Sequence, residues 1–335
     1  MAEPFLDTQT LIVDPLERIM TAWQRNKGMT VALTKACREL GGSFRDIAER
    51  TQHCADRLNI AAFKGPDGEV LFRVNVKDAC NYRLDPVCAR MRSRRMIART
   101  RPKLDQIFAP GGGLTAGFLT LTAISVPLAD IRTGTAEILQ GWRRMTQRKP
   151  FKQAIAGFAR AEEVTLHDTR PLAHPHLHVL LAFRAGYHRR TAGLYIPREQ
   201  WLAMWQGSMK NRAIRMVDIR SLRPRNPEQP LASACAELLK YPFKPTIFEV
   251  DGPGYRVDPK KIEVLHNGLH RRRLFGTGGI LRGAKLEAEE RENLCDEDGV
   301  LTIDDIEDMI RDAREAPLAV ENYRWHADHY VGGAT

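Results

Sequence analysis

The chain lacks the features of a membrane-spanning or secreted protein. No stretch of its 335 residues approaches the roughly 20 consecutive apolar residues that a transmembrane helix needs. The first ten residues, MAEPFLDTQT, contain neither the cationic region nor the apolar run of a secretory signal. The six cysteines are irregularly spaced, which argues against a disulfide framework and indicates a reducing compartment with free or metal-bound thiols. We therefore expect a cytoplasmic protein with no membrane partner.

Repeats and low-complexity tracts are also absent, and the composition is that of an ordinary folded protein. The apolar content is 43% and the charged content 27%, in a chain long enough for two domains. Lys and Arg number 51 against 41 Asp and Glu, a net charge of +10. The surplus is uneven, because Arg90–Arg101 and His270–Arg273 are strongly cationic whereas Glu287–Glu315 is largely acidic. This distribution favours a polyanionic partner such as nucleic acid.

Apolar periodicity predicts a mixture of helices and strands. Helices are expected over Pro15–Asn26, Thr30–Leu40, the Arg-rich run, Thr135–Thr146, Glu199–Gly207 and Pro230–Tyr241, and in an acidic segment with Thr302 as its N-cap. Strands are expected over Phe118–Ser125, Gly157–His167 and Val217–Leu222, with a hairpin over Phe63–Asp78. We expect Gly28 to break the first two helices apart and Ala109–Gly113 to be a linker.

The segment His174–Phe183, HPHLHVLLAF, is the most informative part of the sequence. Its alternation predicts a strand that points His176 and His178 to one face and Leu177 and Val179 into a core. Imidazole is a common metal ligand, so two on one face are a candidate metal pair. The alternative without a metal is that both histidines are ordinary polar residues, hydrogen-bonded within the fold or exposed at the surface. A hydrolase of the HxHxDH type is disfavoured, because Val and Leu follow where that pattern needs Asp and His.

Four segments in chain order resemble the motifs of the replication initiators, or Rep proteins, of small plasmids that replicate by a rolling circle. The resemblance covers roughly Cys54 to Lys244. The segments are FLTLT at Phe118–Thr122, GFARAEEVT at Gly157–Thr165, HPHLHVLL at residues 174–181 and AELLKYPFK at Ala236–Lys244. It implies an α+β fold of the HUH endonuclease superfamily, an antiparallel sheet flanked by helices. An N-terminal helical, zinc-knuckle-like domain would precede it.

The resemblance also implies a catalytic metal ion. The ligands would be His176 and His178, with Glu163 from a neighbouring strand. Two imidazoles and a carboxylate accept several divalent ions, so both Mg²⁺ and Mn²⁺ stay open. His174 would either hydrogen-bond to these ligands from outside the metal site or cap the start of the strand.

The last motif implies a tyrosine nucleophile. Tyr241 would attack a DNA phosphate, leaving a 5′-phosphotyrosine link and a free 3′ hydroxyl. Glu237 lies four residues earlier, so on a helix it shares a face with Tyr241 and could activate a water for the closing cleavage. Lys240 or Lys244 could stabilise the developing charge. Taken alone, a tyrosine at a helix end is more often a core aromatic, and it is the set of motifs that favours Tyr241 as the nucleophile.

The family carries a cysteine cluster before its catalytic region, and this chain has a variant of it. Asp85 stands where the family has a cysteine, within the run Cys80–Cys88, and Cys54 matches the family's earlier cysteine. A zinc site of Cys54, Cys80, Asp85 and Cys88 is therefore predicted, because a carboxylate can ligate zinc. His53 is an alternative ligand. The competing interpretation is a hairpin with buried free thiols.

The cationic run after the cysteines is expected to contact DNA. Its candidate phosphate-binding residues are Arg90, Arg92, Arg94 and Arg95, and Arg90 replaces a tryptophan of the family.

These expectations divide the chain into three segments. Residues 1–108 would be the helical and zinc-binding domain, 112–265 the catalytic domain, and 266–335 a basic and then acidic segment. The expected activity is metal-dependent nicking and rejoining of single-stranded or hairpin origin DNA, with a host helicase and polymerase as further partners. A conjugative relaxase or a single-strand transposase is an alternative enzyme. A non-catalytic DNA-binding regulator on the same scaffold is an alternative of another class.

Overall fold

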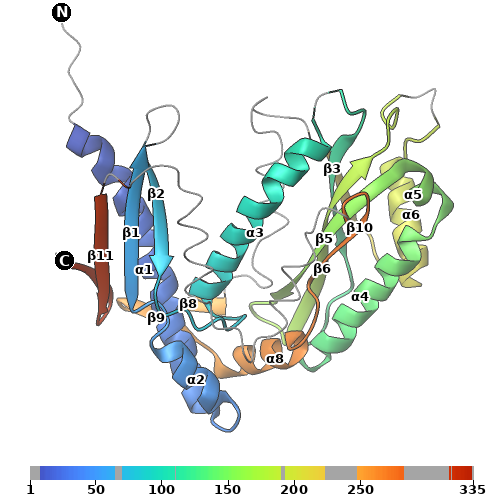
Figure 1. Cartoon of the computed structure of the whole chain (residues 1–335). Coiled ribbons are helices and arrows are strands. Elements are labelled where there is room, and N and C mark those ends of the chain that lie inside the picture. Colours follow the sequence, from blue (N-terminus) through green and yellow to red (C-terminus); the bar gives the residue numbers. More distant parts are fainter. Residues whose placement is uncertain are drawn as a thin grey trace, which may run out of the picture. The chain divides into compact units, whose positions relative to one another are not determined.

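The structure, a computed structural model, describes residues 8–64, 70–109, 111–189, 193–222, 247–282, 317 and 319–333. The chain forms two compact units, each assembled from separated pieces of sequence (Figure 1). Unit 1 comprises Met1–Ala89, Phe248–Ile262 and Glu297–Thr335, and unit 2 comprises Arg90–Ile247 and Glu263–Asp296. The division expected from the sequence ran in three consecutive segments, whereas these units interleave. Among the helices described, none combines the length and hydrophobicity that a membrane crossing requires.

Unit 1 is built on a four-stranded antiparallel sheet in the order β12-β11-β1-β2. The predicted hairpin is present as β1 (Arg57–Lys64) and β2 (Val70–Val76). β11 (Ala319–His326) and β12 (His329–Gly333) come from the far end of the chain, and β11 pairs with β1. The remaining elements are helices α1 (Thr8–Leu40) and α2 (Phe44–Gln52), and the hairpin of β8 (Phe248–Asp251) and β9 (Gly254–Val257).

The predicted break at Gly28 is wrong, because α1 continues through this residue. A Cβ atom at Gly28 would lie 3.0 Å from Cδ2 of Tyr255 in β9. The glycine therefore lets an aromatic ring lie against the helix. Helical glycine costs about 1 kcal/mol relative to alanine, and tertiary packing overrides that preference here.

Unit 2 is built on a six-stranded sheet with the path β10-β5-β6-β3-β7, all of its pairs antiparallel. Its strands are β3 (Thr115–Thr122), β4 (Val126–Pro127), β5 (Ile155–Leu166), β6 (Leu172–Phe183), β7 (Val217–Ser221) and β10 (Phe275–Gly279). Its helices are α4 (Ile131–Thr146), α5 (Lys149–Ala154), α6 (Arg198–Met209) and a short 3-10 turn at Leu128–Asp130. Two helices cross the boundary between the units in sequence, α3 (Pro86–Ile107) and α8 (Pro259–Leu269).

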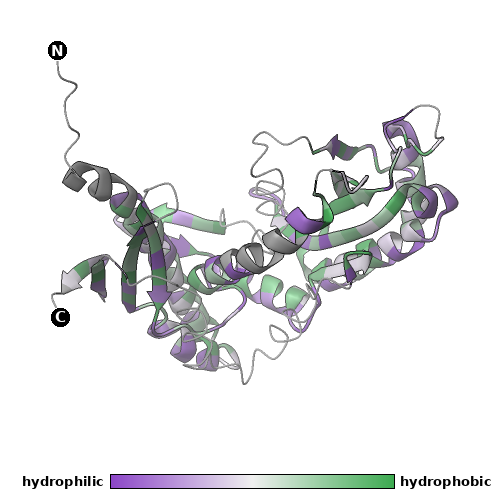
Figure 2. Ribbon diagram, turned by 45° about the horizontal axis from the view of Figure 1, so that its top comes forward, coloured by the Kyte–Doolittle hydropathy of each residue, from purple (hydrophilic) through white to green (hydrophobic). Residues whose placement is uncertain are grey.

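One face of the larger sheet is covered by helices. Leu177 and Val179 of β6 join a buried core with Trp142 of α4 and with Trp201 and Trp205 of α6. Apolar residues are concentrated along these strands in Figure 2. Trp205 also donates a hydrogen bond of 2.8 Å from Nε1 to the carbonyl oxygen of Thr122, which ties α6 to the end of β3.

The opposite face of this sheet is apolar at one end and polar at the other. At one end Phe118 and Leu180 pack with Leu104 of α3 in a smaller apolar core. Beyond this core, β6 presents the partly exposed His178 and His176 in place of apolar side chains. A polar site therefore begins where the apolar cover of this face ends.

The α+β class and the antiparallel sheet flanked by helices are confirmed. The other predicted helices and strands that fall in the described ranges are present with boundaries shifted by a few residues. The helix expected over Pro230–Tyr241 and the acidic helix starting at Thr302 lie outside the described residues.

Gly117 provides a test of this packing. A Cβ atom there would lie 2.2 Å from Cε2 and 2.6 Å from Cζ of Phe183, whose side chain is fully buried. We predict that Gly117→Ala lowers the free energy of unfolding by about 1–3 kcal/mol through overpacking, measured by urea denaturation. Gly254→Ala is the matched control, because the nearest atom to a Cβ there is 3.9 Å away. Equal stabilities of the two variants would contradict the predicted clash.

Candidate active site and metal centre

The site in unit 2 is formed by the polar part of one sheet face. In β6 the histidines at 174, 176 and 178 are partly exposed, while Pro175, Leu177 and Val179 between them are buried. The predicted orientation of His176 and His178 is thus confirmed. Their rings are nearly parallel, at 13°, with centroids 6.4 Å apart.

Glu163 reaches this face from the adjacent strand. In the β5–β6 ladder it lies directly opposite His176, and Ala161 lies opposite His178. The Glu163 carboxylate nevertheless bonds the diagonal neighbour, with Oε2 2.9 Å from Nε2 of His178. Both side chains are largely shielded, at 8% and 12% exposure. The predicted trio therefore lies on one face of two neighbouring strands.

β3 adds a residue that the sequence analysis did not single out. Thr120 lies opposite His178 in the β3–β6 ladder, and its Oγ1 is 3.4 Å from Nδ1 of His178. The Phe118 ring stacks on the same imidazole with a centroid distance of 5.8 Å. Both residues belong to the FLTLT motif, whose alternation could have placed Phe118 and Thr120 on the histidine face. Together they orient His178.

His174 occupies the end of the histidine row. Its Nε2 lies 2.6 Å from the carbonyl oxygen of Ala123, so the ring donates to the backbone just beyond β3. Its ring centroid is 4.3 Å from that of His176. This hydrogen bond lies near the start of β6, which agrees with the expectation that His174 caps the entry of the strand.

The donor chemistry of this face suits a divalent ion. Two imidazoles and one carboxylate lie on the same face of adjacent strands, and the Glu163 carboxylate is within hydrogen-bonding distance of His178. Their ligand atoms are more widely spread than those of a second group in unit 1. Within the described ranges, that second group alone brings three or more such ligand atoms within 4.8 Å of one another.

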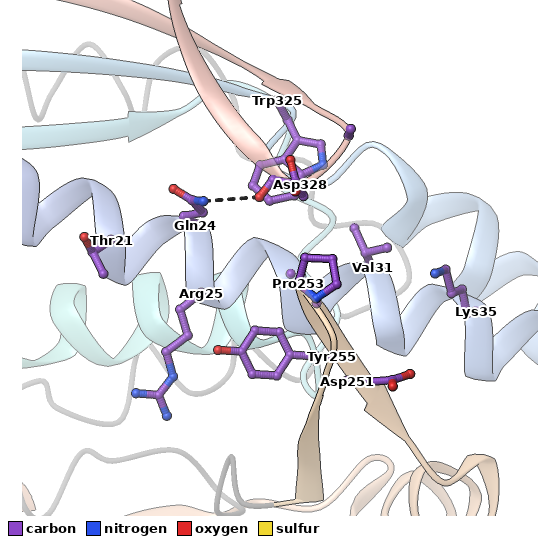
Figure 3. A pocket seen from close by; sticks show the side chains of 13 residues that line it. Thr21, Gln24, Arg25, Val31, Lys35, Asp251, Pro253, Tyr255, Trp325 and Asp328 are labelled. Carbon is purple, nitrogen blue, oxygen red and sulfur yellow. Dashed lines mark hydrogen bonds between the residues drawn. The ribbon is translucent and has the colours of Figure 1, made fainter.

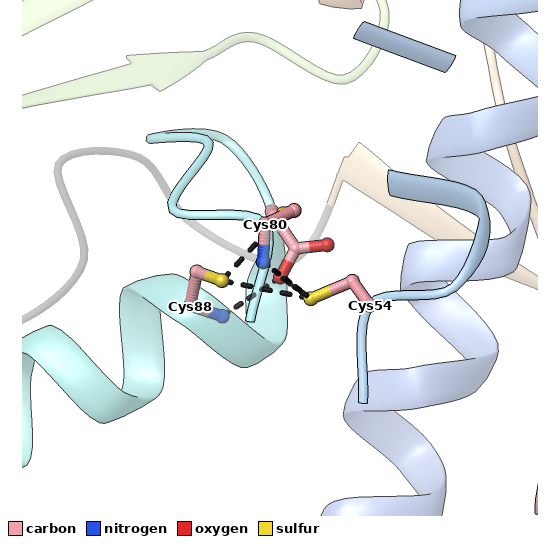
Figure 4. Close-up of side chains that lie close together, drawn as sticks. Cys54, Cys80 and Cys88 are labelled. Atoms are coloured by element: carbon pink, nitrogen blue, oxygen red, sulfur yellow. Dashed lines mark hydrogen bonds between the residues drawn. The ribbon is translucent and has the colours of Figure 1, made fainter. Parts of the chain in front are cut away.

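The second group is Cys54, Cys80, Asp85 and Cys88, the four residues predicted to hold zinc. They come from the turn after α2, the loop after β2 and the start of α3 (Figure 4). Cys88 Sγ lies 3.6 Å from Cys54 Sγ and 3.6 Å from Cys80 Sγ, and the Cys54 thiol is 3.6 Å from Oδ1 of Asp85. The four residues form a group that could hold a metal ion.

Backbone amides point at the sulfur atoms of this group. The amides of Cys80, Asn81 and Tyr82 donate to the sulfurs of Cys54, Cys88 and Cys80, at 3.4, 3.2 and 3.5 Å. Asn81 adopts a left-handed backbone conformation, with φ of 58°, which produces the tight turn after Cys80. Such donors stabilise the thiolate, the form that binds metal. Hydrogen bonds among the thiols, burial and the neighbouring Asp85 act in the opposite direction and raise the pKa of Cys54 and Cys80 well above its usual value.

The two carboxylate oxygens of Asp85 have different surroundings. Oδ1 accepts a 2.7 Å bond from the amide of Cys88, which makes Asp85 the N-cap of α3 with Pro86 in the first helical position. Oδ2 is buried without a hydrogen-bond partner. Burial and the neighbouring Cys88 raise the pKa of the Asp85 carboxyl from 3.8 to about 8. One carboxylate oxygen lies within 4.8 Å of all three sulfur atoms, so the donor set fits a metal.

A buried lysine that the sequence analysis missed holds the Cys54 turn. Lys27 is 1% exposed, and its Nζ donates to the carbonyl oxygen of Cys54 and to Oδ1 of Asp56, both at 2.7 Å. The available clue was a lysine on the apolar side of a helix, four residues after Trp23. His53 is not part of the cysteine group, since its Nδ1 lies 2.9 Å from Asp56 Oδ2.

The structure describes only some of the remaining predicted residues, which are the arginines after the cysteines and the residues of the tyrosine motif. Arg90, Arg92 and Arg95 lie on α3, are partly buried, and each already has an interaction partner. Arg94 lies on the same helix. The tyrosine motif, with Glu237, Lys240, Tyr241 and Lys244, falls outside the described residues, so its position relative to the histidines stays a prediction.

Comparison with known proteins agrees with these observations. Residues 71–331 match a family described as "Replication protein". "Protein rep" from Streptococcus pneumoniae serotype 2 is 30% identical over 290 residues, which are 86% of this chain and 85% of that protein. A "Replication protein" from Staphylococcus aureus is 32% identical over 216 residues, 64% of this chain and 88% of that protein.

The match extends to "Protein rep" from Bacillus amyloliquefaciens, 28% identical over 295 residues. No solved structure matches the chain significantly. The family match spans parts of both units, including the histidine face and Cys80, Asp85 and Cys88 of the cysteine group, while Cys54 precedes it. This chain belongs to the Rep family of plasmid replication proteins.

Proposed function

We propose that this protein initiates rolling-circle replication by nicking and rejoining a single DNA strand at a plasmid origin. The observation that carries the proposal is the row of His176, His178 and Glu163 on one face of an antiparallel sheet, in a member of the replication protein family. Family membership favours an initiator over a relaxase or a transposase. The polar site at an otherwise apolar face favours an enzyme over a non-catalytic regulator.

The chain's own residues prepare a site for phosphate chemistry. Glu163 and the two imidazoles would hold Mg²⁺ or Mn²⁺, which supplies Lewis-acid polarisation of the scissile phosphate when bound. Thr120 and Phe118 fix the orientation of the His178 ring. The helices behind β6 bury the opposite face of the strand in an apolar core.

The nucleophile in this proposal is Tyr241. Its hydroxyl oxygen would lose its proton and form a bond to the phosphorus while the bond to the 3′ oxygen of the preceding nucleotide breaks. The 3′ oxygen gains one proton, which balances the one that the phenol loses. Lys240 or Lys244 would stabilise the developing negative charge. Glu237 would accept a proton from the water that completes the final cleavage. Single-stranded or hairpin origin DNA is the substrate, and a host helicase and polymerase would extend the freed 3′ end.

The cysteine group of unit 1 is proposed to bind zinc through Cys54, Cys80, Asp85 and Cys88. Three thiolates and one carboxylate fit the tetrahedral preference of this ion. The ion would join α2, the loop after β2 and the first turn of α3, and would thereby stabilise unit 1. Arg90, Arg92, Arg94 and Arg95, which follow on α3, are proposed to contact phosphates.

The first prediction concerns the histidine row. His176→Ala should lower the nicking rate of a hairpin oligonucleotide by more than about 100-fold, because even residues that only support a metal ligand contribute about 10- to 100-fold. EDTA should abolish wild-type activity, and Mn²⁺ or Mg²⁺ should restore it. His167→Ala, at an exposed histidine in the loop after β5, is the control. Wild-type nicking by His176→Ala would disprove the metal assignment.

A second prediction identifies the nucleophile. Wild-type protein should form a covalent adduct with the oligonucleotide that survives denaturing electrophoresis. Tyr241→Phe removes only the hydroxyl and should form no adduct. Peptide mapping of the wild-type adduct should recover DNA on Tyr241, and its recovery on another tyrosine would show that the motif is misassigned.

A third prediction follows from Asp85 in metal-depleted protein. The folded form holds the carboxyl proton up to about pH 8, whereas the unfolded chain releases it near 3.8. The unfolded state therefore binds fewer protons in this window, and the free energy of unfolding should fall as the pH rises from about 4 to about 8. The steepest decline should be about 1.4 kcal/mol per pH unit.

Urea denaturation at several pH values measures this decline. Asp85→Asn removes the titrating group and should flatten the curve, while added Zn²⁺ should stabilise the wild-type protein most at neutral pH. Elemental analysis of untreated protein should find about one zinc per chain. An identical pH slope in the wild type and in Asp85→Asn would contradict the assignment.

A further inference from the structure

We propose that the open face of the four-stranded sheet in unit 1 reads the base edges of duplex DNA in the major groove. The inference rests on the proposed function only in taking DNA as the ligand. We define this open face by ten side chains that share one side of the sheet. They are Val331 of β12, Val320, Asn322 and Arg324 of β11, Arg57, Asn59, Ala61 and Phe63 of β1, and Arg73 and Asn75 of β2.

The strand register assigns these residues to one face. In β1 the alternate residues Leu58, Ile60 and Ala62 are buried, which orients Asn59 and Ala61 to the other side. Tyr330 of β12 is also buried on the inner side, where its hydroxyl donates to the carbonyl oxygen of Ala55. The ten residues of the open face are all exposed or partly exposed.

Three asparagines form a row across the open face. Asn59 is the register partner of Asn322 on one side and of Asn75 on the other. The Asn59 amide donates to Oδ1 of Asn322 at 3.0 Å, which aligns the two side chains. Asparagine is depleted from strands, so strand propensity does not account for the row. Its amide can form the bidentate contact with adenine that the major groove offers.

The neighbouring positions supply the other groups that read base edges. Arg57 and Arg324 are register partners in the next row, and Arg73 lies on the opposite side of the asparagines. Asp78 holds the Arg57 guanidinium through Nε at 2.9 Å, and Arg73 stacks over Phe63 at 5.0 Å. Arginine recognises guanine, and small apolar groups such as Val320 contact the thymine methyl.

The charge of the open face suits a polyanion. Its strand positions carry three arginines and no Asp or Glu among the residues that the structure describes there, and one of the three, Arg57, is paired with Asp78 just after β2. The acidic residue of β11, Glu321, has the opposite side-chain direction, since it pairs with the buried Ile60.

The dimensions of the sheet also match a duplex. Neighbouring strands lie about 4.8 Å apart, so the three asparagines span about 10 Å, close to the roughly 12 Å width of the major groove. Successive residues on one side of a strand are about 6.8 Å apart, the rise of about two base pairs. If the strands run along the groove, successive rows of side chains would therefore contact base pairs about two steps apart.

A groove on the other side of unit 1 is a weaker candidate. It has a volume of about 600 Å³ and lies along α1, between the β8–β9 hairpin and the turn after β11 (Figure 3). Arg25 and Lys35 line it together with Asp251 and Asp328, so its charges are balanced. The open face has no such carboxylates within its strands, which is why it is assigned the DNA.

The test uses the full chain and a pool of 20-base-pair duplexes of random sequence. Wild-type protein should enrich a defined site, whose affinity is then compared with that of a shuffled duplex by fluorescence anisotropy. Asn59→Ala and Asn75→Ala should each reduce this preference by about 10- to 100-fold, at adenine positions of the site. Arg324→Ala should reduce binding to the selected site more than Arg45→Ala, an exposed arginine on α2.

Matched controls separate base recognition from folding and from catalysis. Asn267→Ala removes an exposed asparagine of α8 and should leave the preference unchanged. Thermal unfolding of each variant checks the fold, and Asn75→Ala serves if Asn59→Ala is unstable. Adduct formation with a single-stranded oligonucleotide should persist in the open-face variants, so failure of this inference is distinguishable from failure of the nicking proposal.

Three results would overturn the assignment. The first is enrichment of no sequence by the wild type. The second is an unchanged preference in Asn59→Ala, Asn75→Ala and Arg324→Ala. The third is a selected site that binds more tightly as a single strand than as a duplex.

Discussion

Burial of Leu177 and Val179 is the constraint on which the histidine site depends. Side chains alternate along a strand, so anchoring these two residues in the helix-covered core turns His176 and His178 to the opposite face. A slip of one residue would bury the imidazoles and expose the apolar chains. The same register sets Glu163 beside His176 and Thr120 beside His178. The chemistry of the face is therefore fixed by packing on its reverse side.

The cysteine group of unit 1 depends on a different device, a helix cap. Asp85 begins α3 through Oδ1, and the same oxygen lies 3.6 Å from the Cys54 thiol. A cysteine at this position could ligate a metal but would be a poor N-cap, whereas aspartate is among the best. In the proposed zinc site, this one side chain would therefore both cap α3 and bind the metal. Lys27 holds the facing Cys54 turn from α1.

The sequence predicted features that depend on local periodicity. The alternation of HPHLHVLL identified β6 and its faces, and the spacing of the cysteines identified a group that the fold brings together. Other features arise from contacts between distant segments and could not be predicted locally. The helix continues through Gly28, where the Tyr255 ring from a distant hairpin lies against it. Lys27 can be buried because its ammonium group donates to the Cys54 carbonyl oxygen and pairs with the Asp56 carboxylate. The asparagine row requires the pairing of β1 with β11, more than 250 residues away.

That pairing has a consequence for the order in which the protein is made. β1 is synthesised early, but its neighbour β11 follows only after nearly the whole of unit 2, and Tyr330 of β12 supplies the hydroxyl that holds the backbone at Ala55, next to Cys54. On the ribosome the strand would wait with one edge unpaired while unit 2 folds. Closing so long a loop costs little more than closing a shorter one, since the entropy grows only with the logarithm of length. Completion of unit 1 therefore requires synthesis of β11 and β12, and products that terminate before these strands would carry an unfinished sheet.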